Sequence, residues 1–370
     1  MRNAFTFVEM KNKYLKQLHL VLFVTVSICS YSQNKVAFNK LVKNESGDYT
    51  LYDKLYTGES LLLWPSNNKP MQRITWKNGK INGIYSSWYE DGKKDQYVEY
   101  KNGMRNGSFQ TFYRNGSPEV SCVYKDGILD GNYVAHHTNG RLRKKMTFVN
   151  GIEQGPFLLY HSNGQIDQKG IFKNGKPEGL TTSYDREGNI VKEVHYKNGL
   201  RDGPSKLYHT NKQLAEDAHF KKGYYNGEKK VYSPEGQLIS KEYYIEGKLN
   251  GESIKYTMSG NVLEIKTFKN GELNGPYKRF KQQGIDTYGN YKNNLKDGPW
   301  VEHQFATGGP DIGNYIQGKK NGHWKLGATD LFGKCEGEYV DNMKNGTWKY
   351  WKHNGKKLKT EKWNNGVLLK

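Results

Sequence analysis

Residues 107–127 read GSFQTFYRNGSPEVSCVYKDG. Two runs of about seven residues flank the pair Asn115-Gly116. An Asn-Gly pair tolerates positive φ at both central positions of a type I′ turn, whose twist matches that of the flanking strands. The stretch therefore predicts a β-hairpin that is closed by a type I′ turn at Asn115-Gly116.

An aromatic residue recurs in register with Tyr124 along most of the chain. The spacing is 24 residues at every step except one, which is 23. A self-similar period of this length indicates a repeat array and overrides any domain count based on length. The members of this aromatic ladder are Trp76, Tyr100, Tyr124, Phe148, Phe172, Tyr196, Phe220, Tyr244, Phe268, Tyr291, Tyr315, Tyr339 and Trp363.

Glycines mark both ends of each predicted hairpin. The turn pair recurs as Asn139-Gly140 and Asn163-Gly164, and a second pair, such as Gly103 and Gly107, recurs where one hairpin joins the next. No segment with a helical pattern follows these pairs, so they offer no helix N-terminus to hold a phosphate. The array is therefore expected to be an antiparallel meander.

The second strand of each hairpin carries aliphatic residues six and two positions before the ladder, as Leu142 and Met146 do before Phe148. Positions an even number apart share a face of a strand. We therefore expect one face to hold these aliphatics and the ladder, with Cys122 among them, and the other face to hold Lys, Glu, Asp and Gln.

The first strand carries two aromatic columns, represented by Phe109 and Phe112. A spacing of three residues places them on opposite faces unless a bulge intervenes, and the sequence leaves both arrangements open.

The fold class that follows is all-β: an elongated, single-layer antiparallel meander of about 12 hairpins over residues 68–370. Residues 33–67, with Gly58 and Trp64, look like a degenerate first hairpin and are expected to cap the exposed first strand. The composition agrees, because 35% hydrophobic residues fall below the roughly 45–50% of globular domains.

Residues 1–32 have the pattern of a secretory signal peptide. Basic residues precede an apolar run, Leu18 to Cys29, that is too short to span a bilayer, and small residues end at Ser32. Cleavage near Ser32 predicts an exported chain that is periplasmic, on the outer surface or secreted, and not transmembrane. Met10 is an alternative start to Met1, and lipidation of Cys29 is an alternative to cleavage.

The exported chain would be basic and would contain two cysteines. Without residues 1–32, which hold four basic and one acidic side chain, the net charge falls from +20 to +17. The excess serves solubility or attracts an anionic lipid or polysaccharide, and export argues against nucleic acid. Cys122 and Cys335 lie about nine repeats apart, on the order of 80 Å at two strands per repeat, so free thiols are expected.

The residues indicate no cofactor, metal or catalytic site. His137, His161 and His209 occupy equivalent positions, but ligands on neighbouring repeats would lie about 10 Å apart, too far for one ion. We interpret them as a polar column. No Gly-x-Ser-x-Gly or His-Glu-x-x-His motif occurs.

Two sets of residues form the candidate binding surface. Lysines that follow the ladder would line one edge, where they keep the sheet soluble or contact an anionic surface. Tryptophans concentrate near the C-terminus, where they pack the sheet or bind sugar rings or a protein. The candidates are Lys101, Lys125, Lys173, Lys197, Trp300, Trp324, Trp348, Trp351 and Trp363, and the irregular repeats between Gly284 and Asn342 are the first place to look.

The motif Tyr-Lys-Asn-Gly-x-x-x-Gly, seen at residues 196–203, and its variant at residues 268–275 resemble the MORN repeat in its bacterial variant. The resemblance covers about 300 residues and departs near residues 284–342, where Asn294 and Asn342 replace glycine. It implies non-enzymatic antiparallel β units linked to protein assembly and sometimes to phospholipid. Such chains are often labelled antitoxin components, a label that fits poorly with export.

Three functions follow as hypotheses. The first is an exported, non-catalytic scaffold that binds a protein at the cell envelope, and the second is a module for anionic lipid or glycan. An enzyme is the third and would need a buried cleft with clustered polar groups.

Overall fold

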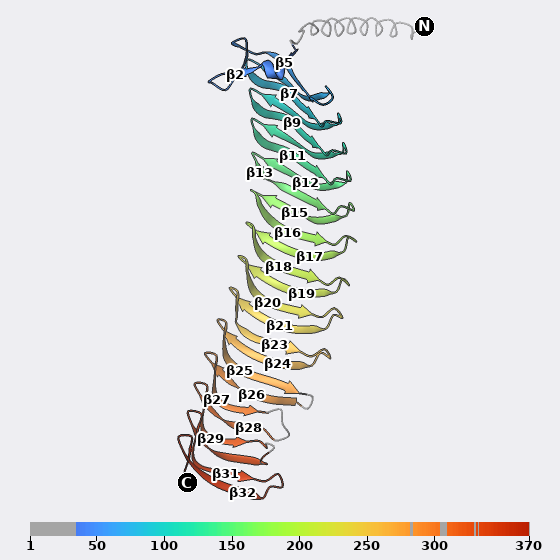
Figure 1. Ribbon diagram of the computed structural model, residues 1–370. Coiled ribbons are helices and arrows are strands. Elements are labelled where there is room, and N and C mark those ends of the chain that lie inside the picture. Colours follow the sequence, from blue (N-terminus) through green and yellow to red (C-terminus); the bar gives the residue numbers. More distant parts are fainter. Residues whose placement is uncertain (1–34, 282–283, 304–308, 329–330, 332, 370) are drawn as a thin grey trace, which may run out of the picture. The chain divides into compact units, whose positions relative to one another are not determined.

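The computed structural model describes residues 35–281, 284–303, 309–328, 331 and 333–369 (Figure 1). The predicted signal peptide at residues 1–32 lies outside this part of the chain. Among the described residues, no helix is long and apolar enough to cross a membrane.

The chain forms two compact units, Met1–Leu142 with Thr147–Gly151, and Arg143–Met146 with Ile152–Lys370. The described part of the first unit contains a 3₁₀ turn, η1 (Phe38–Lys40), and β1 (Lys35–Ala37), β2 (Val42–Lys43), β3 (Tyr49–Leu51), β4 (Lys54–Leu55), β5 (Gly58–Leu63), β6 (Pro70–Lys77), β7 (Lys80–Trp88), β8 (Lys94–Lys101), β9 (Met104–Phe112), β10 (Pro118–Lys125) and β11 (Ile128–His136). Strand β12 (Leu142–Val149) has residues in both units.

The second unit contains β13 (Ile152–Glu153), β14 (Gly155–Tyr160), β15 (Ile166–Lys173), β16 (Lys176–Tyr184), β17 (Ile190–Lys197), β18 (Leu200–Tyr208), β19 (Leu214–Lys221), β20 (Tyr224–Tyr232), β21 (Leu238–Ile245), β22 (Lys248–Leu249), β23 (Gly251–Tyr256), β24 (Val262–Lys269), β25 (Glu272–Lys281), β26 (Gly284–Lys292), β27 (Leu295–Glu302), β28 (Asp311–Ile316), β29 (Lys319–Leu326), β30 (Lys334–Val340), β31 (Met343–Trp351), β32 (Lys357–Asn364) and β33 (Val367–Leu369). Consecutive strands pair antiparallel. The predicted all-β antiparallel meander of hairpin repeats is confirmed.

The turn at Asn115-Gly116 differs from the prediction. Gly116 has a φ of +90°, but Asn115 is not among the residues with positive φ. The Gly116 N–H donates to the Tyr113 carbonyl at 2.8 Å, and the Tyr113 N–H donates to the Ser117 carbonyl at 2.9 Å. This is the three-residue hairpin loop with glycine in the left-handed position, so the type I′ assignment is wrong here.

The two-residue turns lie at the other end of each hairpin. Asn102 and Gly103 have φ of +50° and +82°, and Lys101 pairs with Met104 across them. Two consecutive positive φ values are what a type I′ turn requires. The Gly103 N–H donates to the Ile81 carbonyl of the preceding repeat at 2.8 Å, and this bond recurs at successive turns. It ties each repeat to the one before it.

A bulge follows each of these turns and decides which aromatic column joins the ladder. Between β8 and β9 the register shifts after Val98, so that residues 106–108 stand opposite Glu99. Gly107, with a φ of +112°, provides the backbone conformation that this bulge requires. Phe109 therefore packs on the ladder, with its ring centroid 5.6 Å from that of Tyr124.

The column that contains Phe112 lies on the opposite face of the sheet. Phe109 and Phe112 are an odd number of residues apart in β9, and the pairing of β9 with β10 is regular from Gly107 to Thr111. Phe112 pairs with Pro118, and the register then shifts so that Glu119 has no partner. Residues that face each other across strands point to the same side, so Pro118 shares the face of Phe112.

The register shift at Glu119, and its equivalents in other repeats, changes which residues lie on the apolar face. Residues two positions before the ladder are buried, with Val98 at 1% and Met146 at 3% exposure. Residues six positions before it, such as Leu142 and Ile166, are half-buried and lie across the bulge. Ile166 pairs with Tyr160, and the column six before the ladder therefore belongs to the opposite face, contrary to the expectation from even spacing.

The N-terminal segment covers the first hairpin. Strand β5 pairs antiparallel with β6, and Gly58 faces Trp76 as the bulge glycines of later repeats face their ladder residues. Strand β1 pairs with β5 in parallel. Leu41, Tyr56 and Ile74 bury Trp76 in a small core.

Cys122 and Cys335 are both buried and both free, as predicted. Burial raises the pKa of each thiol to about 11. Both therefore stay protonated and unreactive near neutral pH.

Candidate binding surface

Three of the candidate tryptophans are internal to the sheet. Trp300, Trp324 and Trp348 are 1%, 0% and 0% exposed, so their rings cannot form an open binding face. The prediction that these three tryptophans belong to a binding surface is therefore wrong. They pack the sheet, which is the alternative that the sequence left open.

Glycine makes room for each of these rings. A Cβ on Gly289 would lie 2.2 Å from Cδ2 of Trp300, so the indole rests directly on the backbone of β26. The Trp300 Nε1–H donates to the Asn290 carbonyl at 3.0 Å. Trp324 rests on Gly313 and Trp348 on Gly337 in the same way. Sequence reasoning had noted the tryptophans and missed their glycine partners, which stand two residues before the ladder.

Trp351 and Trp363 are half-buried. The Lys334 ammonium lies 4.9 Å from the ring centroid of Trp351, and the Lys344 ammonium lies 5.0 Å from that of Trp363. Cation–π contacts of this kind already use part of each ring. These two rings remain the accessible part of the predicted tryptophan surface.

Lysines also cover the buried rings. Lys320 lies 4.2 Å from the Trp324 ring and 5.5 Å from the Tyr339 ring. Burial lowers the pKa of Lys320, although Asp311 and Glu302 act in the opposite direction. In the three repeats with internal tryptophans this position, two residues after the two-residue turn, holds Lys296, Lys320 or Lys344, and each ammonium covers a ring instead of forming a free surface charge.

The four candidate lysines are exposed and occupy equivalent places. Lys101, Lys125, Lys173 and Lys197 each end a strand immediately before a two-residue turn. The residue directly after the turn is also exposed, and it is often apolar: Leu200 is 52% and Tyr224 63% exposed. We call the residues directly before and after these turns in the second unit the turn edge. Its members are Ile152, Lys173, Lys176, Lys197, Leu200, Lys221, Tyr224, Ile245, Lys248, Lys269, Glu272, Lys292, Leu295, Ile316, Lys319, Val340, Met343, Asn364 and Val367.

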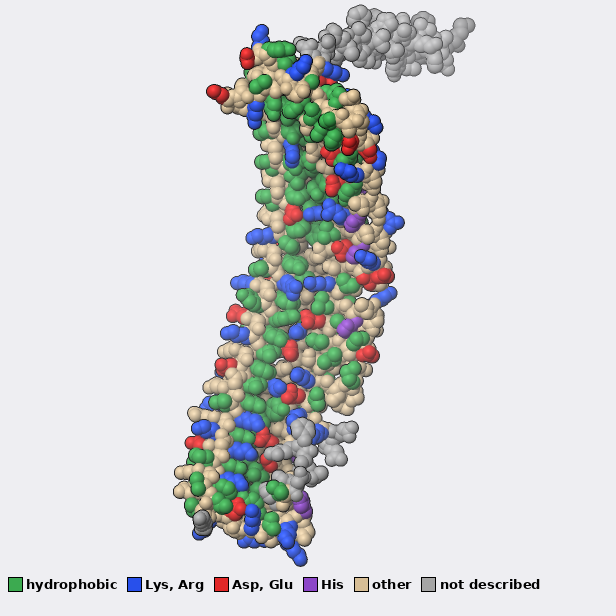
Figure 2. Space-filling view, in the orientation of Figure 1, with side chains coloured by type: hydrophobic (Ala, Val, Ile, Leu, Met, Phe, Trp, Pro, Cys, Tyr) green, Lys and Arg blue, Asp and Glu red, His purple; other side chains and the backbone are tan. Residues whose placement is uncertain are grey.

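The turn edge therefore combines positive charge with unburied apolar surface. In the second unit, Figure 2 shows a continuous band of apolar side chains along the face of the sheet, and separate apolar and Lys or Arg side chains along its edge.

The histidine column fastens neighbouring repeats together. The Nε2 of His161 lies 2.9 Å from the Tyr184 carbonyl, and the Nε2 of His209 lies 2.9 Å from the Tyr232 carbonyl. Tyr113 uses its hydroxyl at the equivalent position to donate to the His136 carbonyl. Among the described residues, no group of three His, Cys, Asp or Glu side chains could hold a metal ion.

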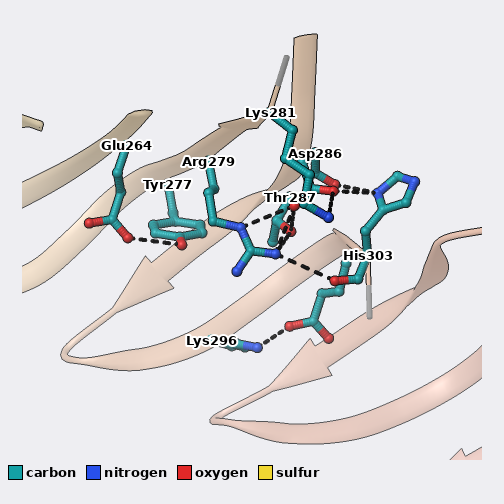
Figure 3. Close-up of polar contacts among 9 residues, drawn as sticks. Glu264, Tyr277, Arg279, Lys281, Asp286, Thr287, Lys296 and His303 are labelled. Atoms are coloured by element: carbon teal, nitrogen blue, oxygen red, sulfur yellow. Dashed lines mark hydrogen bonds and ion pairs between the residues drawn. The ribbon is translucent and has the colours of Figure 1, made fainter. Parts of the chain in front are cut away.

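The irregular repeats contain a buried carboxylate (Figure 3). Asp286 is 6% exposed, and its Oδ2 accepts hydrogen bonds from Nε and Nη2 of Arg279 at 3.0 and 2.7 Å. The Lys281 ammonium lies 3.0 Å from Oδ1. Burial alone would raise the pKa of Asp286, but the hydrogen bonds and charges of Lys281 and Arg279 hold it below its ordinary value.

A hollow of about 430 Å³ adjoins this carboxylate. Lys296 and Glu302 form an ion pair in its wall, and Glu302 also accepts from the Tyr315 hydroxyl at 2.9 Å. Each charge in the wall thus faces an opposite charge, which suits a polar neutral ligand better than an ion. One feature of the sequence could have indicated this carboxylate. The only 23-residue step of the ladder runs from Phe268 to Tyr291, and Asp286 lies within it.

A family model described as the MORN repeat variant matches residues 81–102, 105–126, 153–174, 177–198, 201–222 and 225–246. No curated protein matches the chain. Among solved structures, the Photorhabdus luminescens Tc holotoxin pore with mutation TccC3-D651A is 10% identical over 79% of this chain and 19% of that chain, with a TM-score of 0.16.

Alternansucrase in complex with isomaltononaose is 14% identical over 75% of this chain and 22% of that chain, with a TM-score of 0.18. The TcdB2-TccC3-TEV structure is 9% identical over 86% and 24%, with a TM-score of 0.16. The chain spans about a fifth to a quarter of these chains, and TM-scores this low support no argument. The six matched repeats, together with the ladder and the turn chemistry, identify residues 81–126 and 153–246 as MORN repeats of the variant type.

Proposed function

We propose that the chain is an exported, non-catalytic scaffold that binds a protein partner at the cell envelope through the turn edge of its second unit. MORN repeats are generally non-catalytic and serve as scaffolds for protein or membrane interaction. Export rests on the signal-peptide pattern of residues 1–32.

The observation that supports this proposal most is the exposure of large apolar side chains at one repeated position. Ile152, Leu200, Tyr224 and Leu295 are 50%, 52%, 63% and 48% exposed. A partner that covered several of them would bury apolar surface at about 25 cal/mol per Å². The neighbouring lysines would speed its association if it were acidic.

The test begins with crosslinking of the tagged full chain in intact cells, after fractionation has located it. We expect one reproducible protein partner from the envelope fraction. The double variant Leu200→Ser with Tyr224→Ser should lose most of that crosslink. Met258→Ser is the matched control, because Met258 is 65% exposed but lies at the opposite end of its hairpin, in a three-residue loop.

Two results would contradict the proposal. One is a chain that fractionates with the cytoplasm, and the other is a crosslink that the double variant leaves unchanged. Circular dichroism of each variant shows whether the β fold is retained, so that loss of folding is not mistaken for loss of binding.

The lysines favour a second candidate, an anionic lipid or polysaccharide. Lys173, Lys197 and Lys221 are exposed at successive repeats, and exposed charges are screened over about 10 Å at 0.1 M salt. Binding to vesicles with anionic headgroups should therefore weaken steeply between low and physiological salt, and neutral vesicles should not bind. Replacement of these lysines by glutamine should abolish it, and salt-independent binding would exclude this candidate.

A further inference from the structure

The hollow in the irregular repeats has the size of a small-molecule site. Its volume of about 430 Å³ falls within the roughly 300–1,000 Å³ that such sites usually measure. Three aromatic rings line it, together with the polar side chains of Arg279, Thr287, Lys296, Glu302 and His303. The side chains of Lys296, Glu302 and His303 are 29%, 20% and 33% exposed, so a ligand can reach this wall from solvent.

Buried Asp286 orders one side of this space, which we call the Asp286 hollow (Figure 3). Its carboxylate holds the Arg279 guanidinium, and Nη2 of Arg279 also donates to Thr287 Oγ1 at 2.9 Å and to the His303 carbonyl at 3.4 Å. The ring Nδ1 of His303 lies 3.4 Å from Asp286 Oδ1. The wall is therefore ordered before a ligand arrives, and such preorganisation lowers the entropic cost of binding.

The hairpin itself does not require the ion pair of Asp286 with Arg279. Asp286 is the unpaired bulge residue of β26, and Arg279 of β25 pairs with the residue that follows it. Ile239 and Val231 hold these two places in an earlier hairpin, so an apolar pair serves the same fold. Replacing a buried ion pair by apolar residues is often neutral or stabilising. Stability alone thus does not account for the charged pair, which instead orders the wall of the hollow.

Tyr291 adds a hydroxyl group that the fold leaves unused. Its ring lines the hollow and packs edge-to-face against Tyr277 and Trp300, with centroids 5.7 and 5.1 Å apart. Among the described residues, none forms a hydrogen bond with this hydroxyl. Burial, and then the carboxylate of Glu302, raises the pKa of Tyr291, so the hydroxyl remains a donor at neutral pH.

We propose that the Asp286 hollow binds one ring of a neutral sugar. The charges of its wall are paired, as Lys296 is with Glu302, so a ligand with net charge would be attracted on one side and repelled on the other. A sugar ring carries several hydroxyls, and each hydroxyl both donates and accepts. Adjacent hydroxyls of the bound ring accept from the Lys296 ammonium and the Tyr291 hydroxyl and donate to the Glu302 carboxylate.

A sugar ring matches this wall better than a peptide segment does. A peptide group brings one donor and one acceptor, whereas five polar side chains surround the hollow. None of the lining residues belongs to the turn edge. The sugar site therefore goes beyond the scaffold function and does not depend on it.

The test titrates the full chain separately with D-glucose, D-galactose, D-mannose and N-acetyl-D-glucosamine, followed by saturation-transfer NMR and calorimetry. We expect saturable binding of at least one of these sugars, with an affinity that does not change with salt, because the ligand has no net charge. Tyr291→Phe removes one donor and should weaken binding of that sugar about three- to tenfold. Lys296→Met removes a charged donor and should weaken it at least about tenfold.

Tyr339→Phe and Lys344→Met are the matched controls. Tyr339 is a half-buried ladder residue like Tyr291, and the Lys344 ammonium lies 4.5 Å from the Trp348 ring, much as Lys296 lies over its own indole. Neither residue lines the hollow, so both variants should bind the sugar as the unaltered chain does. Circular dichroism of each variant separates loss of binding from loss of folding.

The inference is wrong if none of the four sugars binds saturably, or if Tyr291→Phe and Lys296→Met bind as tightly as the controls. Affinity that falls steeply with salt, or tighter binding of D-glucuronate than of all four neutral sugars, would show that the hollow prefers an anion and would overturn the neutral assignment. The scaffold proposal fails or stands separately, because Leu200→Ser with Tyr224→Ser alters the turn edge and leaves the hollow intact.

Discussion

At the scale of single residues, the glycines two positions before the ladder decide how the core is filled. Gly313 has ordinary backbone geometry, so its lack of a side chain matters for space and not for conformation. The indole of Trp324 occupies the space that a side chain would need. A small residue in one strand and a large one in the next form a pair that the repeat motif alone does not reveal.

Replacement of Gly313 by Ala should destabilise the second unit by roughly 1–3 kcal/mol, the usual cost of overpacking a filled core. The added Cβ would lie 2.1 Å from Cδ2 of Trp324, and that ring has no exposed side toward which it can move. The measurement is the urea midpoint. Gly309→Ala is the matched control, since a Cβ there meets nothing within 4 Å, and equal midpoints for the two variants would contradict the prediction.

Buried tyrosines should make the fold sensitive to alkali. Burial, and then the carboxylate of Glu264, raises the pKa of Tyr277 from 10.0 to about 12. The folded chain therefore keeps a proton that the unfolded chain loses, and the free energy of unfolding falls as pH rises from about 10 to about 12. Urea unfolding at pH 8 and pH 11 should show this loss, and Tyr277→Phe should make the pH dependence shallower. If Tyr277→Phe loses as much free energy of unfolding between pH 8 and pH 11 as the unaltered chain does, Tyr277 is not the source of the alkali sensitivity.

At the scale of the element, the two-residue turn lies at Asn102-Gly103, where one predicted hairpin joins the next, and the loop at Asn115-Gly116 holds three residues. Both places contain an Asn-Gly pair, and the pair alone does not indicate how many residues the loop holds. The residues around it do: Lys101 pairs directly with Met104, whereas Tyr113 and Ser117 enclose three loop residues. Sequence reasoning found where the chain reverses but not which turn type each reversal uses.

The bulges explain the other error. Alternation placed Leu142 and Met146 on one face, but an extra residue between these positions changes the side to which the strand points. Short polar stretches such as residues 117–119 carry no mark of an unpaired residue. The ladder, the hairpins and the free cysteines were predictable because each depends on the period, whereas the bulges and the glycines beneath the buried indoles depend on how adjacent strands meet.

The left-handed turn position should discriminate among substitutions. Gly103 has a φ of +82°, and a Cβ there would meet nothing within 4 Å, so any penalty is conformational. Gly103→Ala should cost about 1–2 kcal/mol. Gly103→Asn should cost clearly less, because Asn294 and Asn342 adopt φ of +67° and +70° at equivalent turns and keep the inter-repeat hydrogen bond. Thermal unfolding of both variants gives the comparison, and equal losses would count against it.

At the scale of the molecule, successive repeats meet through the same contacts each time. The turn N–H to carbonyl bond joins Gly199 to Pro177, and Gly223 to Arg201. Stability in such an array is close to a sum of repeat terms and neighbour terms, so the period is the natural unit for shortening the chain.

Removal of residues 201–224, one full period, should leave a folded chain with a modest loss of stability. The cut joins Leu200 to Tyr225, which stands where Arg201 stood, so strand order and face are preserved. Removal of residues 201–212 should abolish cooperative folding of that region, because it deletes one strand and brings unlike positions together. Circular dichroism and urea unfolding distinguish the two, and equal damage would show that the repeats are not interchangeable.

The two buried thiols give the chain a pair of built-in chemical reporters. Cys122 belongs to the first unit and Cys335 to the second, and each reacts with an alkylating reagent when its surroundings open. The labelling rate at each sulfur therefore measures the opening free energy of one unit independently of the other. Fraying, partial melting and the protective effect of a bound partner can thus be assigned to one unit or the other by mass spectrometry, without adding a probe to the sequence.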